Sequence, residues 1–193
     1  MPAMKTHDEV RFALRSADRH LQGLVKIFQV EITEMLHNEI RAGRNWEAAL
    51  VGVPQVKIPE AESEIRSFLW ELVHAFDLSL IFVNENLSLG IALDLVSWKT
   101  VDEAATKQGK NSAELQALRA LKAGSSFQQI KEYRNFAHRG QLMLMLEVTE
   151  NGVQGSKLAP EHKGAQSVMD VPVLLSGYLA DLQTVMTSIG FWP

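Results

Sequence analysis

The chain has 193 residues, of which 46% are hydrophobic and 22% charged, and its formal net charge is −4. This composition is typical of a soluble globular protein with one sizeable core, and the acidic balance argues against a broad surface for duplex DNA. The absence of cysteine excludes disulfides, zinc ribbons and thiol chemistry. No apolar signal core or membrane-length apolar run is present, so we expect a cytoplasmic protein without a membrane partner.

The N-terminal part of the chain predicts a long helical region. Apolar residues recur at three- and four-residue steps from about Asp8 to Arg41, which is typical of an amphipathic helix. Gly43 is placed to end this region, and Gly23 is expected to mark a bend or a break into two helices.

The next segment is expected to be a connector followed by a second helix. Gly52, Pro54 and Pro59 interrupt residues 43–59, and such residues favour loops. We expect the second helix to begin after Pro59, to bury a wide apolar face and to end near residues 84–86.

The middle of the chain predicts short helices. Ser88 is placed to cap one that carries apolar residues as far as Trp98, and residues 101–107 are a candidate for a separate helix. Another helix is expected from a cap at position 111 or 112 to Gly124.

The following helix is expected to begin at a serine cap, at position 125 or 126, and to stop at Gly140. Gln128 and Gln129 are placed for a capping box at its start. This helix carries the residues that are best suited to chemistry.

The sequence then changes character. The apolar run Leu142–Val148 is followed by Asn151–Gly152, a strong hairpin-turn signal, but residues 153–158 make a poor return strand. We expect at most a short hairpin or an extended arm, with a helical run as the alternative. A polar loop over 159–169 then leads to a final helix capped by Asp170.

Together these elements predict an all-α fold. It is a bundle of four or five helices in a single domain over residues 1–193. A short β-hairpin or extended excursion, at about residues 141–169, is inserted before the last helix.

Arg134 and His138 are the strongest candidates for a functional site. At about 100° per residue they share one helix face, at the edge of an apolar stripe formed by Phe127, Ile130 and Ala137. An arginine there can hold a phosphate bidentately, and a histidine can move a proton near neutral pH. The pair therefore suits attack of a ribose 2′-hydroxyl on its own phosphate, a reaction that needs no cofactor. The alternative is a structural pair that bridges neighbouring helices.

The stretch Tyr133-Arg134-Asn135-Phe136-Ala137-His138-Arg139-Gly140 resembles the signature of the HEPN superfamily. The resemblance implies a bundle of four or five helices and, in many members, RNase activity in toxin–antitoxin, abortive-infection or CRISPR systems. It also implies a homodimer in which two copies of the motif face each other, with RNA or a nucleotide as ligand, and it leaves room for a cognate antitoxin as partner.

The resemblance assigns roles to residues of this chain. Arg134 and His138 are implied to be catalytic, and the phosphate-binding or supporting residues are then Asn135, Lys131, Arg139 and Tyr133. Only three residues separate Arg134 from His138, fewer than is usual in the family. Counting from Lys131 restores a longer interval, with lysine in place of arginine.

Two further functions stay open. The first is a non-catalytic interaction or scaffold protein of the same fold. Trp46 and Trp70 would suit a subunit interface, with core packing as the alternative for at least one of them. The second is a metal-binding bundle, because the pairs Glu34/His37 and Glu71/His74 have Glu-x-x-His spacing. Helical phase turns both pairs away from the apolar faces, which argues against a buried metal site.

Overall fold

The computed structural model describes residues 2–160 and 170–192. It is mostly helical, with a single two-stranded antiparallel sheet, within these residues, that lies before the last helix. The expected helical class with a β excursion is therefore confirmed. The expected polar loop falls almost wholly on residues 161–169, which lie outside the described residues.

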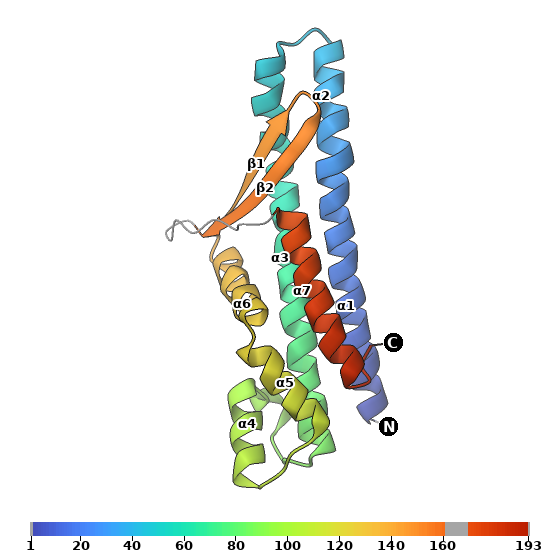
Figure 1. Ribbon diagram of the computed structural model, residues 1–193, viewed down its shortest axis with the longest axis vertical. Coiled ribbons are helices and arrows are strands. Elements are labelled where there is room, and N and C mark those ends of the chain that lie inside the picture. The colour runs from blue at the N-terminus through green and yellow to red at the C-terminus, as the bar shows by residue number, and fades with distance from the viewer. Residues whose placement is uncertain (1, 161–169, 193) are drawn as a thin grey trace. The chain divides into compact units, whose positions relative to one another are not determined.

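The elements follow one another in the order shown in Figure 1: α1 (Pro2–Lys26), the π-helical turn η1 (Ile27–Glu31), α2 (Ile32–Arg41), α3 (Trp46–Asn86), the 3-10 turn η2 (Leu93–Leu95), α4 (Trp98–Lys107), α5 (Ala113–Ala123), α6 (Ser125–His138), β1 (Leu142–Thr149), β2 (Gly152–Pro160) and α7 (Val171–Ser188). The chain divides into two compact units. Unit 1 comprises Met1–Ala17, Trp70–Lys131 and Tyr178–Pro193, and unit 2 comprises Asp18–Leu69 and Glu132–Gly177.

The long N-terminal helical region is confirmed, but the bend is not at Gly23. The helix α1 runs through Gly23, and the irregularity is the π-helical turn η1, which begins four residues later. A Cβ atom at Gly23 would lie 3.1 Å from the Cδ atom of Glu64. Glu64 in turn lies 2.7 Å from the Nδ1 atom of His20. The glycine therefore makes room for a carboxylate on α3, and this offsets the roughly 1 kcal/mol that glycine costs inside a helix.

The connector expected at 43–59 is wrong, because α3 already begins at Trp46 and continues through Pro54 and Pro59. Each proline removes one backbone hydrogen bond from the helix interior. Burial offsets that loss, since Ala49, Val53 and Pro54 are buried in unit 2. Figure 1 shows the first turns of α3 beside α2. The expected end near residues 84–86 is confirmed.

The helix expected after Ser88 is also wrong. Ser88 has a positive φ of 46°, and only the short turn η2 forms before α4. The cap of α4 is Ser97, whose hydroxyl accepts from the backbone N–H of Thr100 in a capping box. By contrast, Ser112 caps α5 and Gly124 ends it, as the sequence predicts.

The start of α6 differs from the expected capping box. Ser125 is already helical. The side chain of Gln128 donates to the carbonyl of Lys122 at 2.6 Å, and the side chain of Gln129 accepts from the Tyr178 hydroxyl at 2.8 Å. The two glutamines therefore tie α6 to α5 and to the part of α7 that belongs to unit 1.

The core of unit 1 is rich in aromatic rings. Phe76 packs on Phe127 with 4.4 Å between ring centroids. A second cluster joins the rings of His7, Phe82 and Phe191, with centroid separations of 4.4 to 5.0 Å. These contacts connect α1, α3, α6 and the C-terminal turn within the unit.

In unit 2 the hairpin is longer and more regular than expected. The strands β1 and β2 pair over their whole length, with one bulge between Glu147 and Val148. The turn places Gly152 against α2, where a Cβ atom would lie only 2.2 Å from the Oγ1 atom of Thr33. Figure 1 shows the hairpin lying beside α2.

Side chains cover backbone groups on both edges of the hairpin. On β1 the N–H of Leu144 donates to a carboxylate oxygen of Glu62 at 3.4 Å, and on β2 the N–H of Ser156 donates to Asp170 at 2.7 Å. The hydroxyl of Ser156 also donates to Asp170 at 2.6 Å and accepts from the N–H of Val171 at 3.1 Å. Ser156 and Asp170 thus share the capping of α7 that the sequence assigns to Asp170 alone.

One helix within the described residues, α3, is long and apolar enough to cross a membrane by length and composition. The apolar window of this helix is 61% buried inside the protein, as in the core helix of a soluble protein. The expectation of a soluble chain is therefore compatible with the fold.

Candidate functional site

The candidate residues lie in the last turns of α6. Two residues after the end of α6, Gly140 has a φ of 68°, a left-handed conformation that favours glycine. The N–H of Gln141 donates to the carbonyl of Phe136 at 2.9 Å, and that of Gly140 donates to Ala137 at 3.2 Å. These bonds form a Schellman cap, which fixes His138 in the last turn.

Burial agrees with the expected helical phase for the apolar stripe and for Arg134. Phe127, Ile130 and Ala137 are all buried, Arg134 is half-buried and His138 is exposed. Arg134 thus lies between the apolar stripe and solvent, at the edge that the sequence predicts.

Asn135 contacts the arginine that precedes it. The Nη1 atom of Arg134 donates to the Oδ1 atom of Asn135 at 3.2 Å, and Asn135 itself is exposed. Because this amide accepts one guanidinium N–H, it restricts the rotamers of the arginine side chain.

The remaining supporting residues differ in their settings. Arg139 is exposed directly after the end of α6, where a cation is favoured by the helix dipole. Tyr133 is half-buried, and burial, with a smaller contribution from the charge of Glu132, raises the pKa of its phenol above the ordinary value of 10.0. Lys131 is half-buried and is the last residue of its segment in unit 1, whereas the other five belong to unit 2.

A small cavity lies behind the helix in unit 2. It has a volume of about 10 Å³, which is room for no more than one water molecule. Ala137 lines it together with Glu62 and Ile65 of α3 and with Leu144 and Leu158 of the hairpin. Neither Arg134 nor His138 lines this cavity.

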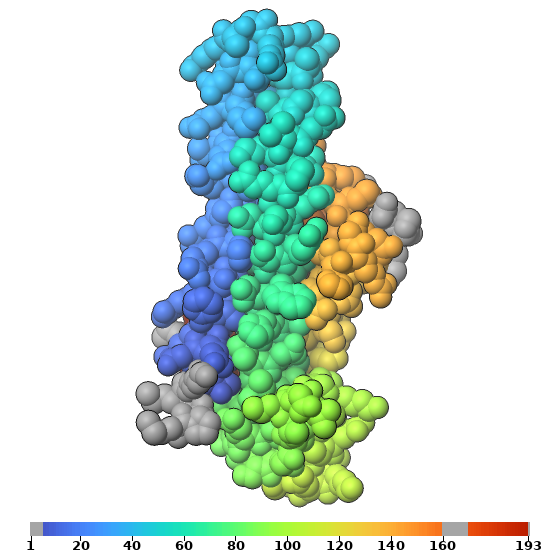
Figure 2. Space-filling model, turned by 180° about the vertical axis from the view of Figure 1, so that it is seen from behind, coloured from blue at the N-terminus to red at the C-terminus, as the bar shows by residue number. Residues whose placement is uncertain are grey.

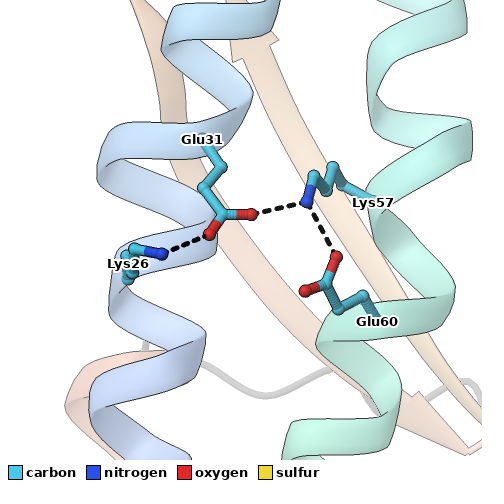
Figure 3. A network of polar contacts seen from close by, with 4 residues as sticks. All are labelled: Lys26, Glu31, Lys57 and Glu60. Carbon is cyan, nitrogen blue, oxygen red and sulfur yellow. Dashed lines mark hydrogen bonds and ion pairs between the residues drawn. The ribbon is translucent and has the colours of Figure 1, made fainter.

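A polar network that the sequence does not predict joins η1 to α3 in unit 2 (Figure 3). Glu31 accepts from Lys57 at 2.5 Å and from Lys26 at 2.9 Å, and Lys57 also donates to Glu60 at 2.8 Å. The hydrogen bond from Lys57, followed by that from Lys26, lowers the pKa of the Glu31 carboxyl. The network contacts no candidate site residue, and its four side chains satisfy one another, so we interpret it as structural.

The residues of the metal hypothesis do not form a cluster. Glu34 and His37 are both exposed on α2 in unit 2. Glu71 and His74 belong to unit 1. Among the residues that the structure describes, no group of three or more His, Asp or Glu side chains could hold a metal ion.

Comparison of the chain with protein-family models, with curated proteins and with solved structures found no match.

Proposed function

We propose that the chain binds RNA or a nucleotide through Arg134 and His138, and that two copies together form a metal-independent endoribonuclease of a toxin–antitoxin or phage-defence system. The observation that carries this proposal is the arrangement at the end of α6. Arg134 is oriented by Asn135 at 3.2 Å, and His138 is exposed one turn further along the same face.

The two side chains suit the two demands of the reaction. The guanidinium of Arg134 would hold the non-bridging phosphate oxygens and stabilise the negative charge that develops on them. The imidazole of His138 would take the proton of the ribose 2′-hydroxyl. The 2′-oxygen then bonds to phosphorus, and the 5′-oxygen of the next nucleotide leaves. The products are a 2′,3′-cyclic phosphate and a 5′-hydroxyl.

The leaving 5′-oxygen needs a proton, and a second acid can supply it. In a homodimer the partner subunit's His138 would fill this role. One motif then acts as base and the other as acid, which explains why the proposal needs two copies. A cognate antitoxin would act by covering the exposed His138.

A second candidate function is a non-catalytic interaction protein of the same fold. It is favoured by the half-burial of Arg134 and by its bond to Asn135, since arginine stems commonly cover apolar surface without binding a ligand. Under this alternative the exposed His138 has no chemical role.

The decisive experiment compares RNA cleavage by the wild-type chain with that by His138→Ala. Removal of a general base is expected to slow cleavage by about 10²- to 10⁴-fold. The products should carry a 2′,3′-cyclic phosphate, and added EDTA should have no effect. A matched control is His37→Ala, because His37 is also an exposed helical histidine of unit 2.

The outcomes separate the two functions. Cleavage that fails with His138→Ala and persists with His37→Ala supports the enzyme. RNA left intact by the wild type, or cut equally well by His138→Ala, refutes the catalytic proposal. Thermal unfolding of each variant shows whether a loss of activity comes from unfolding.

A further inference from the structure

His20 forms an ordered pair with a carboxylate inside unit 2. Its Nδ1 atom lies 2.7 Å from the Oε2 atom of Glu64, and the two side chains are each 30% exposed. Figure 2 shows the segment of α1 that carries His20 lying directly beside α3, which carries Glu64. A carboxylate only accepts hydrogen bonds, so Nδ1 is the ring nitrogen that holds the proton. The pair therefore fixes both the orientation and the tautomer of the imidazole.

The other ring nitrogen of His20, Nε2, is left to react. In the neutral ring it holds the lone pair, because the proton is on Nδ1. It makes no hydrogen bond to any residue that the structure describes, and it is not among the buried polar atoms there that lack a partner. Nε2 therefore reaches solvent.

Gly23 leaves the space in which the carboxylate of this pair lies. A Cβ atom at position 23 would lie 3.1 Å from the Cδ atom and 3.2 Å from the Oε1 atom of Glu64. Any larger residue would press on the carboxylate, and glycine inside a helix costs about 1 kcal/mol. The chain thus keeps a destabilising residue three positions after His20, where it allows the carboxylate to stay on the imidazole.

Nucleophilic attack is the chemistry that this pair fits best. An imidazole lone pair can bind a metal, accept a proton or attack an electrophile. Metal binding needs further ligands, and within residues 2–160 and 170–192 no group of three or more His, Asp or Glu side chains could supply them. Proton transfer needs a substrate held nearby, but His20 lines neither the cavity of about 10 Å³ nor a groove of about 240 Å³ between α2 and α3. Attack on a group that another molecule carries in needs only an oriented nitrogen at the surface.

We propose that His20 is a phosphoryl-acceptor site whose donor is a phosphoramidate, a function separate from that of Arg134 and His138. The lone pair of Nε2 attacks phosphorus, the bond from Nε2 to phosphorus forms, and the bond from phosphorus to the nitrogen of the donor breaks. The positive charge that develops on the ring lies beside the carboxylate of Glu64, which stabilises it. The departing amine takes up the proton that Nδ1 then releases. Because one phosphorus–nitrogen bond replaces another, the transfer needs no further reactant.

The test is incubation of the full-length chain with phosphoramidate itself. Peptide mass spectrometry gives the rate at which each histidine gains a phosphoryl group, and phosphorus NMR identifies the phosphorus–nitrogen bond. His37, His74 and His138 are exposed, whereas His20 is half-buried. If exposure alone set the rate, these three histidines would react first. We expect His20 to react first, because only its ring is oriented by the carboxylate of Glu64.

Two variants test the role of the carboxylate. Glu64→Ala should slow phosphorylation of His20 by at least about tenfold, since loss of a group that orients a reactive imidazole typically costs about 10- to 100-fold. Gly23→Ala should also slow it, because the added Cβ atom displaces the carboxylate without removing it. Gly52→Ala is the matched control, since this glycine also lies inside a helix of unit 2 but has nothing within 4 Å of its Cβ position. It should leave the rate at His20 unchanged.

A wild type in which His20 reacts no faster than the three exposed histidines overturns the proposal. So does a rate at His20 that is the same in Glu64→Ala, or in Gly23→Ala, as in the wild type. Thermal unfolding shows whether each variant is folded. If Glu64→Ala fails to fold, the comparison among histidines of the wild type decides, because it needs no variant. RNA is absent throughout, so the result is independent of whether the chain binds RNA.

Discussion

Gly152→Ala tests how the hairpin of unit 2 docks on α2. The added Cβ atom would lie 2.2 Å from the Oγ1 atom and 3.3 Å from the Cβ atom of Thr33. Rotation of the Thr33 side chain can move its Oγ1 atom but not its Cβ atom, which stays 3.3 Å from the added carbon. The hairpin turn and α2 must therefore separate slightly.

Backbone strain and overpacking both contribute to the loss of unfolding free energy in Gly152→Ala. Gly152 has a φ of 102°, and an alanine held at positive φ costs about 1–2 kcal/mol. Overpacking against Thr33 adds about 1–3 kcal/mol. The sum is a loss of roughly 2–5 kcal/mol of unfolding free energy, which lowers Tm by about 4–20 °C for a chain of this size.

The assay is thermal and urea unfolding followed by circular dichroism, with two comparison variants. Gly43→Ala has a similar φ of 79° but nothing within 4 Å of its Cβ position, so it should lose only the roughly 1–2 kcal/mol of backbone strain. Adding Thr33→Ala to Gly152→Ala should recover the packing part of the loss. If Gly152→Ala unfolds at the temperature of the wild type, or if Thr33→Ala gives no recovery, the described docking of the hairpin is wrong.

Two other substitutions test contacts within unit 2. Ser156→Ala should lower the unfolding free energy by about 1–3 kcal/mol, because it leaves the buried N–H of Val171 without its hydroxyl acceptor, whereas the exposed Ser176→Ala should have little effect on urea unfolding. Glu31→Gln should make the free energy of unfolding fall less steeply as the pH is lowered. The bonds from Lys57 and Lys26 lower the pKa of Glu31, so the stability they contribute is present above the ordinary carboxyl value of 4.5 and is lost as pH falls through the lowered value. Urea midpoints of both chains between neutral pH and pH 3, at low salt because the group is partly exposed, measure this difference, and equal slopes would contradict it.

Elements with local signals were predictable from the sequence. The cap at Ser112 and the end at Gly124 bound α5 as expected, because both depend on hydrogen bonds within a few residues. The hairpin was predictable from Asn151–Gly152 for the same reason, although the turn itself is formed by residues 150–151 and Gly152 pairs with Thr149.

Elements that depend on distant contacts were not predictable. The helix from Trp46 to Pro59 is held by burial against other segments, and this outweighs the local preference of two prolines for a break. The role of Gly23 depends on Glu64, which lies far along the chain. No period or motif in the sequence encodes such a pair.

For the candidate site, the sequence predicts which helix face carries Arg134 and His138, but not which residues of other elements lie next to them. A rotation of about 100° per residue is enough to place Arg134 and His138 on one face, and the burial of Ala137 agrees with it. The bond between Arg134 and Asn135, and the hairpin residues behind Ala137, depend on the folded chain. The binding and catalytic roles of these residues stay predictions.

The most direct test of the central claim is the affinity of the chain for a fluorescent single-stranded RNA, measured by anisotropy at fixed salt. Loss of one phosphate-binding arginine should weaken binding by roughly 10- to 100-fold, since a hydrogen bond to a charged group contributes about 1.5–3 kcal/mol. We therefore expect Arg134→Ala to bind at least about tenfold more weakly than the exposed-arginine control Arg15→Ala, with both variants folded. Equal affinities of the two variants, or a wild type that does not bind RNA or nucleotides, would contradict the account.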